Sequence, residues 1–298
     1  MDTKKNTTSI FDFSYTEAER KEEIQNMKNI QIPEFEEIIF KERTHKYCLL
    51  IPLFNEGKRF LSQVKKMQTN GVFDSIDVII CDAGSSDGTT DPKYLKKSGF
   101  TAILIRNGLG RYSTDLRMGY YWSIKKGYSG FITVDGNDKD DTVAIPDFIN
   151  KLDDGYDYIQ GSRYVSGGHA IHTPFIRHWA LKLINEPVMS ICARKHLTDT
   201  TNGFRAYSLK FLLDDRVLPF RNVFYGYELI YYLPVRACRL GFRVVEIPVI
   251  RAYPKGKTPT KVGGIRGNVY QLSILWKIIL NFYNPKRKYR DNRSDRYR

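Results

Sequence analysis

Short apolar runs alternate with helical segments through the middle of this chain, and this alternation constrains the fold more than any other feature. The runs are rich in β-branched residues, which favour strands. The expected strands are 47–52, 77–81, 101–105, 131–134, 157–160 and 244–249, and the helical segments between them include 58–67 and 114–126. Strands that alternate with helices predict an α/β fold with a mostly parallel central sheet.

Polar residues follow several of these runs, and in parallel sheets ligands bind at the carboxyl ends of the strands. In chain order these residues are Asn55, Glu56, Asp82, the Gly-rich cationic turn at 107–111, Asp135 and Asn137. Two oxygen side chains one residue apart can hold Mg²⁺ or Mn²⁺, which usually keep substrate phosphates as further ligands. Taken singly, each segment is equally typical of a polar turn. Together they indicate a nucleotide-diphosphate site with a metal, and the absence of a GxxxxGK[ST] motif argues against a P-loop.

Length and composition predict one large domain or two small ones. The 298 residues are 42% apolar, which is enough for a sizeable core. No apolar run is long enough for a membrane-spanning helix, and the first residues lack the apolar segment of a secretory signal. The four cysteines have no CxxC spacing, so we expect reduced thiols and a cytoplasmic location.

Three parts are expected along the chain: an N-terminal helical extension over 1–45, the α/β domain over 46–265, and an amphipathic helix with a basic tail over 266–298. Residues 251–298 carry 13 Lys or Arg against two Asp. The segment 267–283 is helical in character and carries Trp276 and Phe282, which suit a membrane interface. The alternative is that this helix packs on the domain core. A membrane contact and packing on the core are compatible if only one face of the helix is buried.

The motifs at these strand ends resemble those of family 2 glycosyltransferases with the GT-A fold, and within them the dolichyl-phosphate mannose synthase-like branch. The resemblance covers about residues 46–265. The matching segments are IPLFNE (51–56), CDAGSSDGTT (81–90), NGLGRYSTDLRMG (107–119), VDGND (134–138), GSRYVSGG (161–168), DTTNGFRAYS (199–208) and EIPV (246–249).

The resemblance implies a donor site for a UDP- or GDP-sugar with a bound Mg²⁺ or Mn²⁺. The residues implied for the base, the ribose and the diphosphate are Pro52, Asn55, Glu56, Asp82, Asp87, Gly110, Arg111, Arg117, Asp135 and Gly136. Asp135 and Asn137 stand at the metal-binding motif. Asn137 is a neutral and weaker ligand than the Asp that the family has there, so Asp138 or Asp140 is an alternative ligand.

On the acceptor side, the resemblance implies that Arg163, Arg177 and Arg205 position a phosphate, since guanidinium groups suit phosphate oxygens. A phosphate acceptor is already an anionic nucleophile and needs no base. A sugar hydroxyl would need a carboxylate base, for which Asp140 and Asp141 are candidates. The expected function is therefore inverting, metal-dependent transfer to a polyprenyl phosphate or lipid-linked glycan. The alternatives are transfer to a sugar hydroxyl in polysaccharide synthesis and a non-catalytic family member.

Two other classes of protein are less consistent with the sequence. A sugar nucleotidyltransferase normally has a Gly-rich loop with a cation after the first strand, where this chain has Phe54, Asn55 and Glu56. A nucleic-acid partner is not expected, because the basic tail lacks an alternation of aromatic and basic residues set on a sheet. The expected partners are an anionic membrane surface or a membrane protein, with peripheral association at the cytoplasmic face, and a homo-oligomer is left open.

Overall fold

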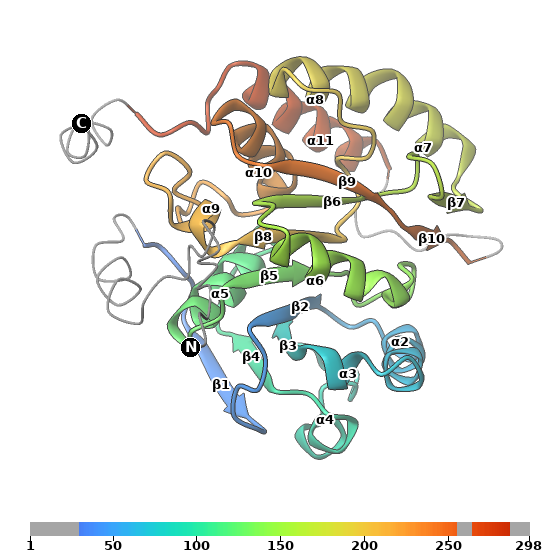
Figure 1. Cartoon of the computed structure of the whole chain (residues 1–298), viewed down its shortest axis with the longest axis vertical. Helices are drawn as coiled ribbons and strands as arrows, with labels where there is room; N and C mark the ends of the chain where they lie inside the picture. The colour runs from blue at the N-terminus through green and yellow to red at the C-terminus, as the bar shows by residue number, and fades with distance from the viewer. Residues whose placement is uncertain (1–29, 255–263, 287–298) are drawn as a thin grey trace, which may run out of the picture.

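An eight-stranded mixed sheet forms the centre of the protein in the computed structural model, which describes residues 30–254 and 264–286 (Figure 1). In spatial order its strands are β1 (Phe35–Ile39), β4 (Ala102–Arg106), β3 (Asp77–Asp82), β2 (Tyr47–Leu53), β5 (Gly130–Thr133), β8 (Arg205–Ser208), β6 (Tyr158–Ser162) and β9 (Val244–Pro248). A second sheet pairs β7 (His169–Ile171) with β10 (Ile250–Ala252) in parallel.

The six strands expected from the sequence all form, within a residue or two of their expected ends. Strands β4, β3, β2 and β5 are parallel neighbours, while β8 runs antiparallel to both β5 and β6. The sheet is therefore mostly parallel, as expected for an α/β fold, with β1 and β8 as its antiparallel members.

Helices cover both faces of this sheet. They are α2 (Lys58–Thr69), α3 (Val72–Ser75), α4 (Pro92–Ser98), α5 (Tyr112–Lys125), α6 (Ile145–Asp153), α7 (Phe175–Ala180), α8 (Glu186–Ala193), α9 (Leu209–Leu213), α10 (Glu228–Arg239) and α11 (Gly264–Ile279), with a 3₁₀ turn η1 (Thr142–Ala144) and a π-helical turn η2 (Leu181–Asn185). Figure 1 shows α8, α10 and α11 grouped beside β6 and β9.

Alternation along β2 explains why the sheet has a core on each face. Cys48 and Leu50 are buried in one core together with residues of α5 and α10. Leu49 and Ile51 are buried in the other core together with residues of α2 and α6. Successive side chains of a strand point to opposite faces, so a strand covered on both sides has a continuous apolar sequence.

The strand order places a ligand-binding position between β2 and β5. The chain runs from β2 outward through β3 to β4 and then returns to the other side of β2 as β5. Loops leave β2 and β5 in opposite directions at such a point, which opens a crevice at the carboxyl ends of the strands. The loops after β2, β3, β4 and β5 carry the residues expected to bind the donor.

The expected boundary at residue 46 is wrong for the described part of the extension, because β1 belongs to the central sheet. Phe35 pairs with Arg106 and Ile39 with Ala102, antiparallel to β4. This strand carries three glutamates around it and lacks a long apolar run, which is typical of an edge strand. The helix expected before Asn29 lies outside the described residues.

Helix α11 buries one face against the core and exposes the other, so packing on the core is confirmed and a membrane contact of the exposed face stays a prediction. Ile274 and Ile278 are buried against the core that contains α8 and α10. Trp276 is 63% exposed and Val269 59% exposed. Within the described residues, no helix combines the length and the apolar character needed to cross a membrane. All four cysteines have free thiols, as expected.

Candidate active site

The loops after β2 and β3 interlock through the side chains expected to bind the nucleoside. Asp82 accepts hydrogen bonds from the Ser85 amide (3.0 Å) and hydroxyl (2.6 Å). Asn55 accepts from the Ser86 amide (2.8 Å), and Asp87 accepts from the Gly57 amide (2.8 Å). Burial raises the pKa of Asp82 above its ordinary value despite these hydrogen bonds. The structure therefore brings Asn55, Asp82 and Asp87 together, where they fix the shape of the two loops.

Pro52 lies within β2, and Glu56 pairs with Arg59 at 2.7 Å at the start of α2. Glu56 is half-buried beside the same loops. These two residues thus stand at the end of β2 where the sequence places them, between the interlocked loops and α2.

The two arginines expected to hold the diphosphate have different positions on α5. Arg111 is exposed at the N-cap of this helix, directly after Gly110. Arg117 is 2% exposed and donates to the Gln31 carbonyl and to Asn222 Oδ1. Burial lowers the pKa of Arg117 to about 10. Arg117 therefore ties the N-terminal segment to the loop before α10, and the expectation that it contacts the diphosphate is not supported by its position.

Asp135 lies at the end of β5 with its carboxylate held on two sides. The Tyr112 hydroxyl donates to Oδ1 (3.1 Å), and Arg251 Nη2 donates to Oδ2 (2.9 Å). Gly203 leaves the space for this carboxylate, because a Cβ there would lie 2.6 Å from Asp135 Oδ1. Burial alone would raise the pKa of Asp135, but the charge and hydrogen bond of Arg251 outweigh it and hold that pKa below its ordinary value.

The donor atoms beside Asp135 fit a hard divalent cation. Asn137 Nδ2 lies 3.4 Å from Asp135 Oδ2. Asn137 Oδ1 is buried and has no hydrogen-bond partner in the described part of the chain. A buried acceptor without a donor is costly, and a metal ion would satisfy it. No group of three or more His, Cys, Asp or Glu suited to a metal occurs among the described residues, so the protein would supply few ligands.

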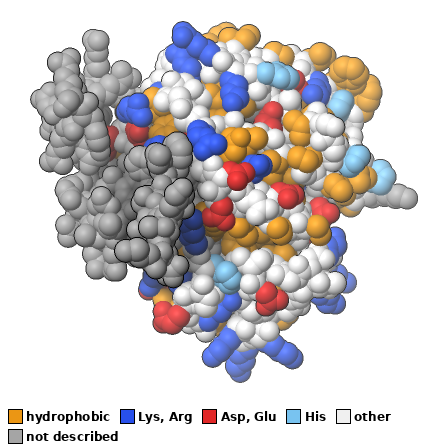
Figure 2. Space-filling model, in the orientation of Figure 1, with side chains coloured by type: hydrophobic (Ala, Val, Ile, Leu, Met, Phe, Trp, Pro, Cys, Tyr) orange, Lys and Arg blue, Asp and Glu red, His pale blue; other side chains and the backbone are white. Residues whose placement is uncertain are grey.

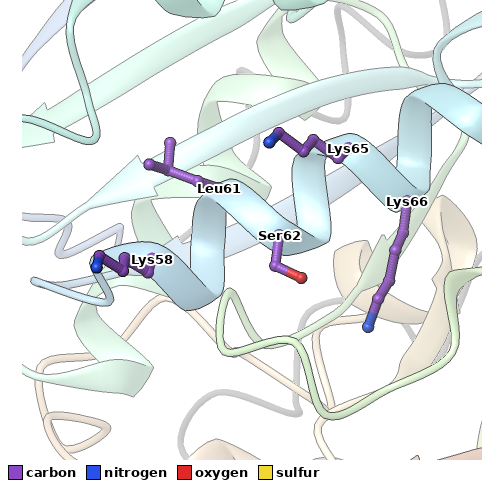
Figure 3. Close-up of a pocket in the computed structure, with 5 residues that line it drawn as sticks. All are labelled: Lys58, Leu61, Ser62, Lys65 and Lys66. Carbon is purple, nitrogen blue, oxygen red and sulfur yellow. The ribbon is translucent and has the colours of Figure 1, made fainter.

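The other acidic residues of this loop point elsewhere. Asp138 bonds to Ser62 (2.7 Å) and Lys66 (2.8 Å) on α2, so it is not the alternative metal ligand. Ser62 and Lys66 also line a pocket drawn in Figure 3, whose lining residues all belong to α2. Asp141 accepts from the Val143 amide as the N-cap of η1.

Asp140 does not have the environment of a general base. It is 6% exposed and bonds to Arg251 Nη1, and its backbone forms a bridge with that of Arg251. Burial raises the pKa of Asp140, with the nearby charge of Asp135 adding to the effect and Arg251 opposing it. The expectation that Asp140 acts on a substrate hydroxyl is therefore corrected: this side chain anchors Arg251.

The three arginines expected at the acceptor are not equivalent. Arg205 is 2% exposed and donates to the carbonyls of Thr200, Asn202 and Ile230, so it holds the backbone and not a ligand. Arg163 forms a bidentate ion pair with Asp199 at 2.6 and 2.7 Å. The remaining Arg163 nitrogen, Nη1, is buried without a hydrogen-bond partner in the described residues.

Four cations gather around Tyr253, and we call this group the Tyr253 cluster. Three of them lie 5.1 to 5.8 Å from the centre of its ring: Lys139, Arg177 and Arg251. Arg163 is the fourth, because its charge acts on the Tyr253 hydroxyl. Burial would raise the pKa of Tyr253, but the charges of Arg251, Arg177 and Arg163 outweigh it and lower that pKa. Asp199 pairs with Arg163, and Asp135 and Asp140 pair with Arg251, so Lys139 and Arg177 supply the excess positive charge of the cluster that suits an anion.

Sequence reasoning missed Arg251, Tyr253, Lys139 and Tyr112. Arg251 and Asp135 are 116 residues apart, and no local pattern connects them. One signal was present: the segment after the last expected strand reads IRAYP, where a cation interrupts an apolar strand-like stretch. A charged residue in such a place is almost never buried unless it is paired.

The chain was compared with known proteins, and no family model matches it. Undecaprenyl-phosphate mannosyltransferase of Micrococcus luteus is 26% identical over 235 residues, which cover 76% of this chain and 92% of the relative. Polyprenol monophosphomannose synthase of Mycolicibacterium smegmatis is 25% identical over 211 residues, which cover 69% of this chain and 77% of the relative. Both relatives thus match most of the chain.

Solved structures show the same fold. Glucosyl-3-phosphoglycerate synthase from Mycobacterium tuberculosis, in complex with Mn²⁺, UDP and glucosyl-3-phosphoglycerate, aligns with a TM-score of 0.53 at 14% identity. The alignment covers 80% of this chain and 78% of that one. The comparisons agree with the resemblance carried by the motifs: the protein is a glycosyltransferase of the GT-A fold, similar to the polyprenyl-phosphate glycosyltransferases of family 2.

Proposed function

We propose that the protein transfers a sugar from a UDP- or GDP-linked donor to the phosphate of a polyprenyl phosphate, with inversion at the anomeric carbon. The observation that carries this proposal is the Tyr253 cluster, in which Lys139, Arg177 and Arg251 lie around one ring and Arg251 also donates to the metal-type carboxylate of Asp135. Relatives named for undecaprenyl phosphate and polyprenol as substrates support the same acceptor.

The surroundings of the acidic residues favour a phosphate over a sugar hydroxyl as the nucleophile. A hydroxyl would need a carboxylate base within hydrogen-bond reach. Asp138, Asp140 and Asp141 are each engaged, by Lys66, by Arg251 and by the Val143 amide. A phosphate oxygen needs no such base, and it is stabilised by the cations of the cluster.

On the donor side, Asp135 and Asn137 Oδ1 would hold Mg²⁺ or Mn²⁺, and the solved structure with Mn²⁺ and UDP supports this assignment. When bound, such an ion neutralises charge on the leaving nucleotide diphosphate. Arg111, at the N-cap of α5, adds an exposed positive charge that suits a phosphate.

On the acceptor side, Arg177 and the free Nη1 of Arg163 would orient the attacking phosphate. Asp199 holds the rest of the Arg163 guanidinium in place through its bidentate pair. Tyr227 stacks on Tyr112 with ring centres 5.4 Å apart, near Asp135, Arg111 and Arg177. This aromatic pair stands between the two sides, where the transferred sugar would lie.

We further infer that the protein associates with the cytoplasmic face of a membrane. The outer face of α7, η2 and α8 exposes Phe175, Ile176, Leu183 and Ile191, and Ile176 is 83% exposed. Helix α11 packs on α8 and exposes Trp276. Figure 2 shows hydrophobic side chains at the upper edge of the molecule, where Figure 1 places α7 and α8. Free thiols fit a reducing compartment.

Sugar transfer can be tested directly with the full chain, a panel of UDP- and GDP-sugars, Mn²⁺ and a short-chain polyprenyl phosphate in detergent. The expected result is a lipid-linked sugar with one class of nucleotide and inverted stereochemistry at the anomeric carbon. Asp135→Asn should lower product formation by about a hundredfold or more, because it removes the charged ligand of the metal.

The matching polyprenol, which has a hydroxyl in place of the phosphate, is the control acceptor. Equal transfer to the polyprenol would contradict a phosphate nucleophile. Donor binding can be followed separately by the rise in melting temperature that a nucleotide causes by mass action. No rise with any UDP- or GDP-sugar would contradict the donor half of the proposal.

A further inference from the structure

Arg251 lies between two carboxylates that belong to the same loop. Its Nη2 donates to Asp135 at 2.9 Å, and its Nη1 donates to Asp140 and, at 3.1 Å, to Asn202 Oδ1. The residue is 6% exposed. A single guanidinium charge thus neutralises two buried carboxylates, one of which is the proposed metal ligand.

The positive charge of Arg251 does not satisfy every acceptor around it. Asn137 Oδ1 and Asp140 Oδ1 are both buried, and neither has a hydrogen-bond partner in the described part of the chain. An unsatisfied amide oxygen and an unsatisfied carboxylate oxygen give this site capacity for more positive charge than one guanidinium provides.

The two halves of the Arg251 guanidinium are held with different strength. On the Asp140 side the backbone also takes part: the Asp141 amide donates to the Ile250 carbonyl (3.0 Å) and the Ala252 amide donates to the Lys139 carbonyl (2.8 Å). On the Asp135 side there is one side-chain hydrogen bond. The contact with Asp135 can therefore break while β10 stays in place.

We propose that Arg251 is an internal cation that competes with the divalent metal for Asp135. In the ligand-free protein Arg251 neutralises Asp135. When a divalent ion binds Asp135 and Asn137, the bond from Nη2 to Asp135 breaks, and Arg251 remains anchored to Asp140. The released Nη2 then faces the Tyr253 cluster, where it can donate to a substrate phosphate. This inference rests on the proposed metal site. It implies that a substrate phosphate increases the affinity for the metal, because the phosphate accepts the hydrogen bond that Asp135 loses.

Mn²⁺ affinity without any nucleotide tests the competition, with free Mn²⁺ measured by its electron paramagnetic resonance signal. Arg251→Met removes the competing charge, so its Kd for Mn²⁺ should be at least about fivefold lower than that of the wild type, given the strength of like-charge repulsion at short range. Adding UDP should tighten Mn²⁺ binding by a larger factor in the wild type than in Arg251→Met.

Lys66→Met is the matched control, because it removes one positive charge beside the same loop without touching Asp135. Its Kd for Mn²⁺ should stay within about twofold of the wild type, since exposed charges are screened. If Arg251→Met does not fold, Arg251→Lys replaces it, because lysine keeps the charge but cannot span both carboxylates. The Kd of the Arg251→Lys variant should then fall below that of the wild type.

A Kd of the Arg251 variant that is unchanged or higher would overturn the competition. This outcome is distinct from failure of the proposed function, which is measured by nucleotide binding and by sugar transfer. Adding Asp135→Asn to the Arg251→Met variant should remove the gain in affinity. A gain that survives this change would show that the ion binds elsewhere and would also overturn the inference.

Discussion

Asp135 shows how much of the site depends on single residues far apart in the sequence. Its carboxylate is bounded by Tyr112 from α5, Arg251 from β10 and the backbone of Gly203 before β8. Each of these comes from a different part of the chain. The position of the carboxylate is therefore set by the folded structure and not by the loop that carries it.

Gly203→Ala should disturb this carboxylate selectively. The added Cβ would lie 2.6 Å from Asp135 Oδ1 and 2.9 Å from the Tyr112 hydroxyl, so the carboxylate must move. We expect kcat/KM to fall by about tenfold or more, which corresponds to about 1.4 kcal/mol of transition-state stabilisation. Steady-state kinetics and the melting temperature of the same preparation provide the measurement.

Gly130→Ala is the control for overpacking alone. Its Cβ would lie 2.8 Å from the Tyr47 ring, at the opposite end of β5 from Asp135. It should lower stability by about 1–3 kcal/mol, as overpacked cores do, with little change in kcat/KM of the folded fraction. Equal kinetic effects of the two substitutions would argue against a special role for Gly203.

The sequence predicted the loop residues of the site better than the arginines. Asn55, Asp82 and Asp135 follow strands that could be recognised from their apolar runs, and the structure brings these residues to one edge of the sheet. Arg117 and Arg205 occur in motifs of the family, yet both bond to backbone carbonyls. Whether an arginine faces a ligand or a carbonyl depends on tertiary neighbours that a motif does not contain.

At the scale of elements, α5 joins the donor site to the framework of the fold. Its N-terminus carries the exposed Arg111, and six residues later Arg117 is buried against Gln31 and Asn222. Residues six positions apart lie on different faces of a helix, since one turn takes 3.6 residues. One helix therefore carries a candidate ligand contact and a structural contact.

A pair of substitutions separates these two roles. Arg111→Met should raise the KM for the donor several-fold with an unchanged melting temperature, because an exposed cation contributes little to folding. Arg117→Met should lower the free energy of unfolding by about 1–3 kcal/mol, since it leaves buried acceptors unsatisfied, with little effect on the KM. Steady-state kinetics with varied donor give the KM, and urea unfolding gives the free energy of unfolding. A large increase in the KM of Arg117→Met would contradict the structural role of Arg117.

In the central sheet the sequence predicted the parallel strands but missed the two antiparallel ones. Strands β2 and β3 are buried along their whole length and contain continuous apolar runs. Strand β8 reads RAYS and β1 reads FEEII, so neither has that signature. Both form because neighbouring strands provide their hydrogen bonds, which is information that local sequence does not hold.

At the scale of the whole molecule, polar and apolar features of the proposed acceptor site meet on one side. Arg177, a member of the Tyr253 cluster, is on α7, and Phe175 and Ile176 of the same helix are exposed. A polyprenyl phosphate has the same division, with an anionic head on an apolar chain. The arrangement would let the phosphate reach the cluster while the chain stays in the lipid.

Vesicle binding should depend on this apolar side. Replacing Ile176 and Trp276 with Ser should weaken sedimentation with phosphatidylglycerol vesicles by about tenfold or more, because each buried apolar side chain contributes about 1.5–3 kcal/mol. Ile39→Ser is the control, since Ile39 is 43% exposed on β1, far from α7 in Figure 1. Undiminished binding of the double variant would favour a protein partner over lipid at this surface.

The position of β8 in the sheet also determines when β6 can pair during synthesis of the chain. In the described part of the sheet, β6 is hydrogen-bonded to β8 and β9, and both follow it in the sequence. As the chain leaves the ribosome, β1 to β5 can assemble as soon as Thr133 has emerged, because each of these strands already has a neighbour. The segment between Tyr158 and Asn202 must wait for Ser208. A nascent chain paused in that interval would expose the apolar residues of α7 and α8 before β8 and β9 are available to complete the sheet. Such an intermediate is expected to bind chaperones or the membrane.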